Sequence, residues 1–275
     1  MQHTFHTPEP TSLYVELGSG DLDVRVEDVT ETTVDVEGHN AEDVTVEQRE
    51  DQIVVLAPRR GGTFFGGGRD LRVRVSMPTS SRFATKVGSA DVHTSGRLGE
   101  TMVKSGSGDV SVEDVDGSAL LESGSGDLSV GNVTGELRVK SGSGDVEVDR
   151  VDGQASISTG SGDVEVGVAG DVVQIKSGSG DGRIRDARAS VSVGTASGDL
   201  VIDTMHRGEL RANNVSGDIR VGIPAGVPVW TDISSMTGTV HSDLDGAGEP
   251  ADGQDYIEMR AKTISGDIYL DSVTW

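Results

Sequence analysis

Along most of this chain, a Ser-Gly-Asp triplet or a one-residue variant of it returns every 18 residues. Six equal intervals do not arise by chance, and a constant period of this kind is the sequence signature of a repeat architecture. The triplet then recurs with looser spacing at Asp218 and Asp267, and an outlying copy ends at Asp21. The regular copies end at Asp91, Asp109, Asp127, Asp145, Asp163, Asp181 and Asp199.

The apolar residues keep the same register as the triplets. Positions one and three after the Asp hold pairs such as Val110 and Val112, or Leu128 and Val130. A spacing of two places these side chains on one face of an extended strand. Each 18-residue unit therefore reads as two or three short strands without a helix. One unit cannot bury its apolar face alone but stacked coils can, so the pattern predicts an all-β, parallel, right-handed β-solenoid (β-helix).

The Gly and Asp of each triplet predict a corner between two strands. Gly adopts positive φ, or allows close approach of another backbone segment, because it has no Cβ. Asp is expected to accept hydrogen bonds from backbone N–H groups one or two residues further along and so to fix the bend. Stacking aligns the aspartates about 5 Å apart, where each neighbour costs ~0.8 kcal/mol of repulsion in water. Lys104, Glu122 and Lys140 alternate in charge five residues before their Asp and would offset part of it.

Residues 1–80 do not follow the 18-residue rule, although they still read as strands. We expect residues 1–80 to form a β-hairpin extension that caps the solenoid, since an uncovered end exposes hydrogen-bonding strand edges. Residues 81–275 are expected to form the solenoid itself, with a looser period after residue 200. A Gly-rich tip at Arg59–Asp70 carries Phe64 and Phe65. These aromatics read either as folding back onto a flexible hairpin tip or as an exposed anchor for a partner.

Charge and composition exclude several classes of function. The formal net charge is -23, and such a field repels nucleic acid and anionic membranes, which bind clustered Lys and Arg. No apolar run approaches the ~20 residues of a transmembrane helix. There is no Cys, so disulfides and thiolate chemistry are absent. The start, MQHTFHTPEP, shows neither the basic nor the apolar region of a secretory leader, and we therefore expect a cytoplasmic protein.

Four stretches of the chain carry a family resemblance. They are the repeated SGSGDV, VRVSMPTSSRFATKVGSADV (Val73–Val92), IRVGIPAGVPVWTDISSMTGTV (Ile219–Val240) and AKTISGDIYL (Ala261–Leu270). In these stretches the chain resembles the bacterial DUF4097 "putative adhesin" family of β-strand-repeat proteins over nearly its whole length. The resemblance implies the same fold and an adhesin-like role without catalytic residues. Because some relatives accompany envelope-stress genes, it also implies a link to envelope stress.

Neither a catalytic motif nor a complete calcium motif is present. The six His are scattered and no HExxH, GxSxG or P-loop pattern occurs, so we expect neither enzymatic activity nor a cofactor. Calcium-binding β-rolls repeat GGxGxDxUx every nine residues, whereas this chain spells its Gly-Asp corner once in 18. The corner aspartates therefore read first as structural and second as calcium ligands. The calcium candidates are Asp109, Asp127, Asp145, Asp163, Asp181 and Asp199.

These observations together predict a non-enzymatic β-solenoid that acts as a scaffold or protein-interaction module. The sequence does not identify the protein partner, and association of two copies through the solenoid ends is one option. The alternative is a calcium-binding, β-roll-like protein that uses the corner aspartates as ligands.

Overall fold

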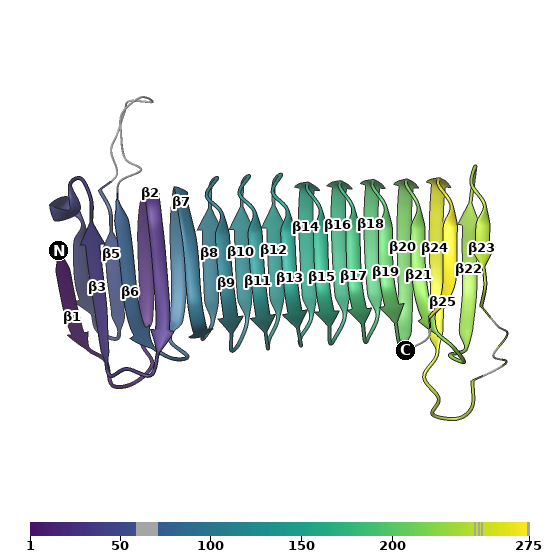
Figure 1. The fold of residues 1–275 in the computed structure, drawn as a ribbon, viewed down its shortest axis with the longest axis horizontal. Coiled ribbons are helices and arrows are strands. Elements are labelled where there is room, and N and C mark those ends of the chain that lie inside the picture. Colours follow the sequence, from purple (N-terminus) through teal and green to yellow (C-terminus); the bar gives the residue numbers. More distant parts are fainter. Residues whose placement is uncertain (59–70, 245, 247, 249, 274–275) are drawn as a thin grey trace. The chain divides into compact units, whose positions relative to one another are not determined.

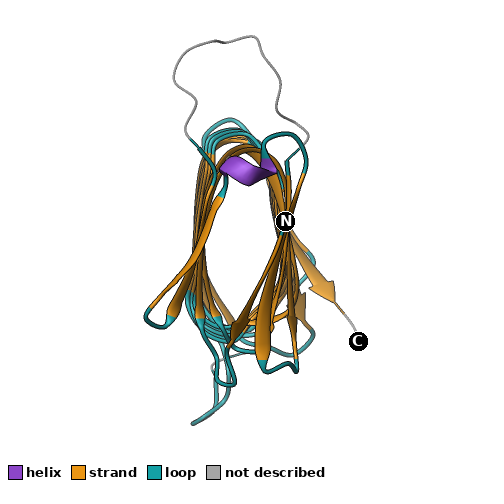
Figure 2. Ribbon diagram, turned by 90° about the vertical axis from the view of Figure 1, so that its left-hand side faces the viewer, coloured by secondary structure: helices purple, strands orange, loops and turns teal. Residues whose placement is uncertain are grey.

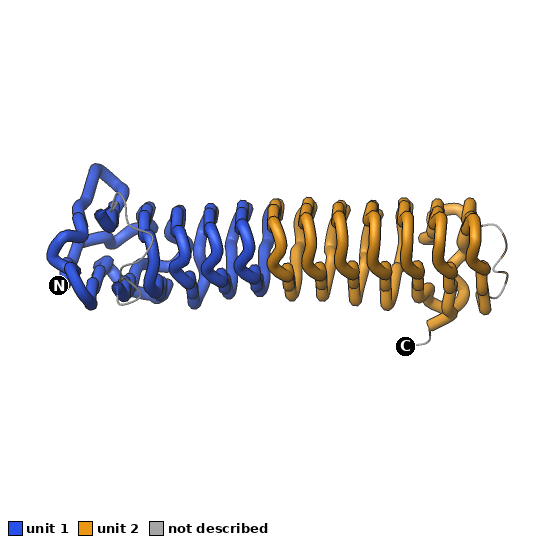
Figure 3. Tube along the Cα trace, turned by 90° about the horizontal axis from the view of Figure 1, so that it is seen from above, with its two compact units in different colours: residues 1–135 blue, residues 136–275 orange. Residues whose placement is uncertain are grey.

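The computed structural model describes residues 1–58, 71–244, 246, 248 and 250–273 of the 275-residue chain. The chain divides into two compact units, residues 1–135 and residues 136–275, which Figure 3 distinguishes by colour. Within the described residues every element is a β-strand except one short 3-10 helix, η1 (Ala41–Asp43). The prediction of an all-β chain is therefore confirmed.

The strands are labelled in Figure 1. Those of unit 1 are β1 (Gln2–His6), β2 (Ser12–Glu27), β3 (Glu31–Glu37), β4 (Thr45–Arg49), β5 (Gln52–Leu56), β6 (Arg72–Pro78), β7 (Arg82–Leu98), β8 (Thr101–Ser105), β9 (Val110–Val115), β10 (Ala119–Ser123) and β11 (Leu128–Val133). Those of unit 2 are β12 (Leu137–Ser141), β13 (Val146–Val151), β14 (Ala155–Ser161), β15 (Val164–Ala169), β16 (Val173–Ser179), β17 (Gly182–Ala187), β18 (Val191–Ser197), β19 (Leu200–Met205), β20 (Gly208–Ser216), β21 (Ile219–Pro224), β22 (Val229–Ser235), β23 (Val240–Ser242), β24 (Ile257–Ser265) and β25 (Ile268–Val273).

Alternating side chains explain why these segments are strands and where the core lies. In β13, Val146 and Val148 are at most 1% exposed, whereas Glu147 between them faces solvent. The same alternation in β15 buries Val164 and Val166. The strands of each unit form two facing walls joined by loops, and the buried aliphatic side chains fill the space between the walls (Figure 2). Val dominates because a β-branched side chain packs well on a pleated surface.

Unit 2 is a parallel solenoid with two strands in each coil. Its first wall contains β12, β14, β16, β18 and β20, and its second wall contains β13, β15, β17, β19 and β21, with neighbours in each wall parallel. Leu137 lies opposite Ala155, and Ala155 lies opposite Val173, so each coil advances by the 18 residues of the sequence repeat. The predicted parallel β-solenoid is confirmed, while its right-handed sense stays a prediction.

The looser period after residue 200 has a topological cause. Strands β22 and β23 follow β21 in the chain but do not pair with β20 and β21. Instead β24 pairs with both β20 and β22, and β25 pairs with both β21 and β23. Figure 1 shows the yellow strands β24 and β25 between their two neighbours. The coil of β24 and β25, which comes last in the sequence, therefore lies between the coil of β20 and β21 and the coil of β22 and β23.

Unit 1 combines antiparallel and parallel pairing. β3 is antiparallel to both β1 and β6, and β4 is antiparallel to β5. The long strands β2 and β7 are parallel to each other, with Ser12 opposite Arg82, and β8 to β11 continue the parallel coils. The capping role expected for residues 1–80 stays a prediction.

Candidate interaction site

Hydrogen bonds connect the corner aspartates of successive coils. In unit 2 the backbone N–H of Asp163 donates to Oδ1 of Asp145 over 2.8 Å, and that of Asp181 donates to Oδ1 of Asp163 over 2.7 Å. The contact recurs from Asp199 to Asp181, from Asp218 to Asp199 and from Asp267 to Asp218 at 2.7–2.8 Å. In unit 1 it joins Asp109 to Asp91 and Asp127 to Asp109, each at 3.0 Å. We refer to these nine residues as the aspartate ladder.

The ladder contact differs from the local turn contact expected for these aspartates. The Asp carboxylate accepts an N–H from the next coil, because coils stack about 4.8 Å apart and the Asp side chain is long enough to span that distance. The corners at Asp109, Asp127 and Asp145 are closed instead by a buried Ser four residues before the Asp. Ser141 Oγ donates to the carbonyl oxygen of Gly144 at 3.0 Å and accepts the N–H of Gly144 at 3.1 Å. In these coils Ser therefore shapes the corner, and Asp joins one corner to the next.

Hydrogen bonds and a neighbouring ion pair offset the repulsion that we expect in the ladder. Each N–H donated to a carboxylate is a charge-assisted hydrogen bond, which is shorter and stronger than a neutral one. Lys104 and Glu122 form the expected ion pair beside the ladder of unit 1, with Nζ 2.9 Å from Oε2. In the part of the chain that the structure describes, no group of three or more His, Asp or Glu side chains could hold a metal ion. Calcium binding at the six candidate aspartates stays a prediction.

The ladder of unit 2 ends in a cluster that the sequence reasoning did not single out. Oδ1 of Asp267 accepts both the N–H of Thr239 at 2.8 Å and its hydroxyl at 2.9 Å. Oδ2 of Asp267 accepts the hydroxyl of Tyr269 at 3.1 Å. The Tyr269 ring is stacked on His241 with 5.0 Å between centroids, and the Arg220 guanidinium lies 5.0 Å from its centroid. Thr239 stands where the next Asp of the repeat would be, so the ladder stops there.

These contacts move two pKa values in opposite directions. The backbone N–H of Thr239, its hydroxyl and the Tyr269 hydroxyl hold the pKa of the Asp267 carboxyl below its ordinary value. The hydrogen bond to Asp267 raises the pKa of the Tyr269 hydroxyl. Since each contact favours ionised Asp267, the cluster is strongest when this carboxyl is charged and Tyr269 is neutral.

We expect acid to loosen this cluster before it unfolds the chain. A carboxyl whose pKa is lowered by folding contributes stability above its unfolded pKa and loses it as pH falls through the folded pKa. The Thr239 amide resonance should therefore titrate below pH ~4, the ordinary Asp value. In Asp267→Asn, which keeps an amide oxygen as acceptor, that titration should disappear. An identical Thr239 titration in Asp267→Asn would contradict the assignment.

An exposed apolar column accompanies the ladder in the last coils of unit 2. The position three residues before the corner Asp is Gly in the regular coils, and a Cβ at Gly178 would lie 2.6 Å from the carbonyl oxygen of Gly160. The register places Ala196, Val215, Ile264 and Met236 at this position in the successive coils β18, β20, β24 and β22. All four are exposed, Val215 at 50%, Ile264 at 47% and Met236 at 76%. We refer to these four residues as the apolar column.

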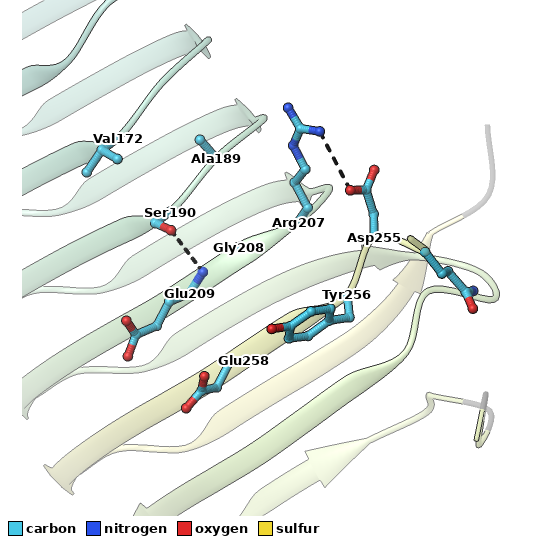
Figure 4. Close-up of a pocket in the computed structure, with 10 residues that line it drawn as sticks. Val172, Ala189, Ser190, Arg207, Gly208, Glu209, Asp255, Tyr256 and Glu258 are labelled. Carbon is cyan, nitrogen blue, oxygen red and sulfur yellow. Dashed lines mark hydrogen bonds and ion pairs between the residues drawn. The ribbon is translucent and has the colours of Figure 1, made fainter. Parts of the chain in front are cut away.

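A pocket of about 390 Å³ lies at the opposite ends of some of the same strands (Figure 4). Its apolar lining includes Val172 and the ring of Tyr256, which is 48% exposed. Its polar lining is engaged in holding turns, because Arg207 pairs with Asp255 at 3.6 Å and the Ser190 hydroxyl accepts the N–H of Glu209. The pocket can therefore receive an apolar side chain, but it offers no converging set of polar groups for chemistry.

The remaining sequence predictions concern parts outside these clusters. Phe64 and Phe65, the predicted partner anchor, lie outside the described residues. Over the described ranges, no helix is long and apolar enough to cross a membrane. The apolar column was missed, although its signal is present in the sequence. Reading three residues back from each Asp gives Gly142, Gly160 and Gly178, then Ala196, Val215 and Ile264.

This chain is similar to one protein family and to several solved structures. A family model described as Toastrack DUF4097 matches residues 11–172 and 167–271. A solved "putative adhesin" from Bacteroides fragilis NCTC 9343 is 12% identical over 99% of this chain and 96% of that one, with a TM-score of 0.39. A "putative lipid binding protein" from Parabacteroides distasonis ATCC 8503 is 13% identical over 100% and 96%, with a TM-score of 0.48. No curated protein matches the chain.

Proposed function

Because the chain belongs to the DUF4097 (Toastrack) family, we propose that it is a non-enzymatic, adhesin-like β-solenoid that acts as a protein-interaction module. The apolar column is the observation that carries this proposal. Exposed apolar side chains are ordinary when they are single, but a contiguous row marks an interaction site. Four neighbouring rungs at the strand spacing of about 4.8 Å give a row about 14 Å long.

The charge beside the column indicates the chemistry of the partner. Asp199, Asp218 and Asp267 follow the column residues of their coils by three positions and lie at the same corner. Oδ1 of Asp199 and Oδ1 of Asp218 each accept a backbone N–H from the next coil, so these carboxylates place negative charge beside the column. The chain as a whole carries a net charge of -23, which attracts cationic partners over a longer range. The partner we propose is a protein segment with apolar side chains flanked by Lys or Arg.

Site-specific photo-crosslinking in native lysate tests this proposal. A photo-crosslinking phenylalanine derivative in place of Ile264 should capture one basic protein, and the same derivative in place of Met102 should not. Met102 is a matched control because it is 43% exposed but lies on β8, outside the column. Capture should fall in about 1 M salt, where the Debye length is about 3 Å.

A second pair of variants distinguishes specific binding at the apolar column from non-specific binding to exposed apolar side chains. Val215→Asp should abolish the crosslink from Ile264 by adding a charge to the apolar row, whereas Met102→Asp should leave it unchanged. Capture of an acidic protein, equal capture from both positions, or a crosslink that survives Val215→Asp would each refute the proposed partner chemistry.

A further inference from the structure

The coil made of β22 and β23 lies at one end of the stack in unit 2. Among the described strands, β22 pairs only with β24 and β23 pairs only with β25. Since β24 and β25 occupy the other side of this coil, its free side faces away from the stack (Figure 1). The end coil therefore presents one strand edge on each of the two walls.

The register shows which backbone groups lie on these free edges. The N–H of Ile257 donates to the carbonyl of Pro228, and the N–H of Met236 donates to the carbonyl of Thr263. In a parallel ladder the N–H and C=O groups of every second residue point to the same neighbouring strand. The backbone groups of residues 230, 232 and 234 therefore face β24. The N–H and C=O groups of Val229, Thr231 and Ile233 then point away from it. By the same alternation the N–H and C=O groups of Val240 and Ser242 in β23 point away from β25.

Between the two edges the core is open. Val229, Ile233 and Val240 point inward, in register with Ile257, Ala261 and Ile268, which are 0% exposed. In the end coil the same positions are only half-buried or exposed, and Val240 is 47% exposed. Exposed Trp230 (59%) on β22 adds to the apolar surface of this coil.

The end coil is also poor in charge compared with the rest of the chain. From Val229 to Asp243 the only acidic residues are Asp232 and Asp243 and the only basic residue is His241, in a chain with a net charge of -23. Edges that natural proteins keep free usually carry Lys, inward-pointing charges or bulges. This coil has no Lys or Arg, and its inward positions are uncharged.

We propose that the free side of the β22–β23 coil is the docking surface for a second copy of this chain, end to end. A single strand from another protein would pair with one wall and leave the other edge and the core open. A second copy offers two edges at the same separation and an open apolar core between them. A two-fold axis across the walls would set β22 antiparallel to β22 of the partner, and β23 antiparallel to β23, as an isologous contact.

The size of the surface sets the expected affinity. Stable interfaces use about 20–30 residues on each side, and the end coil offers only about 15, so the contact belongs to the weak class. We therefore expect a dissociation constant on the order of 10 µM or weaker, with dimers visible only at high concentration. This inference uses a different surface from the apolar column and stands apart from the proposed function.

Sedimentation of the full chain from roughly 1 µM to roughly 1 mM should show a reversible monomer–dimer equilibrium. Thr231→Pro removes an N–H that points away from β24, and edge strands accept Pro at such positions. It should weaken dimerisation at least ~10-fold without changing the urea midpoint. Ile233→Lys places a charge in the open core and should act likewise. The matched control is Val172→Lys, because Val172 is 39% exposed in unit 2 but lies outside the end coil.

The absence of Cys allows a direct test of which surfaces meet. A spin label on Asp232→Cys should report a second label within about 25 Å, the length of one seven-residue strand, and only at dimer concentrations. A wild-type chain that stays monomeric to about 1 mM, or a dimer unaffected by both Thr231→Pro and Ile233→Lys, would overturn the proposal. Growth into longer oligomers would also overturn it, because an isologous contact closes at two copies.

Discussion

The Gly180→Val variant is expected to lose at least ~3 kcal/mol of unfolding free energy. Gly180 occupies the corner of unit 2 with φ of +128°, a conformation that β-branched residues avoid. A Cβ at this position would lie 2.2 Å from the carbonyl oxygen of Gly162 in the preceding coil. Neither atom is the end of a flexible side chain, so one coil must move relative to the other. Midpoints of urea unfolding, compared at equal slope, measure the loss.

Gly194→Ala is the matched control for this substitution. Gly194 lies on β18, its φ is not positive, and nothing is within 4 Å of the position of an added Cβ. Replacing it with Ala reduces the entropy of the unfolded chain, so a change of less than ~1 kcal/mol in the stabilising direction is expected. If Gly180→Val unfolded at the wild-type midpoint, the corner glycines would have a purpose other than close coil stacking.

The repeat was predictable because its residues are compatible with only a few backbone conformations. An 18-residue spacing of Ser-Gly-Asp, with Val at positions such as 146 and 148, leaves little besides stacked two-strand coils. The register of unit 2 reproduces that spacing directly. What each polar residue contacts was less predictable. The role of Asp145 depends on the distance between coils, which is set only once the coils are stacked.

We did not predict the order of the last coils from the sequence. β22 and β24 both carry the apolar alternation of the first wall, and either could pair with β20 by that criterion. Burial separates them in the structure, because Met259 and Ala261 in β24 are fully buried whereas Thr231 in β22 is exposed. The coil with the more polar interior lies at the end, since an outer coil has no further coil to cover it. The polar substitution at position 231 was the available signal.

Part of the candidate site was predictable from the sequence, and part depends on the stacking of the coils. The spacing of the repeat places the corner aspartates in a column, and the structure adds that each carboxylate accepts an N–H from the next coil. The stack of Arg220, Tyr269 and His241 joins residues up to 49 positions apart. These residues lie close together because β25 is inserted between β21 and β23. No local sequence pattern predicts that insertion.

Substitutions at Asp181 are expected to separate a structural ladder from a calcium-binding one. Asp181 Oδ1 accepts the N–H of Asp199 at 2.8 Å, and its own N–H donates to Asp163. Asp181→Ala deletes that acceptor and should cost about 1–2 kcal/mol, the range between a neutral and a charge-assisted hydrogen bond. Asp181→Asn keeps an amide oxygen as acceptor and removes one charge from a repelling column. It should be neutral or slightly stabilising, and more so at low salt, where screening is weak.

Calcium changes this ranking only if the ladder binds it. A ligand at 100 times its dissociation constant stabilises the folded state by about 2.7 kcal/mol, and that gain would be lost in Asp181→Asn. We expect instead that chelation shifts the melting temperature of wild type by only a few degrees, because Oδ1 of each of these carboxylates already accepts a backbone N–H. Urea midpoints of wild type, Asp181→Asn and Asp181→Ala, with millimolar Ca²⁺ and with Na⁺ at matched ionic strength, decide between the two. A destabilisation of Asp181→Asn that occurs only with Ca²⁺ would show that the aspartate ladder is a calcium site.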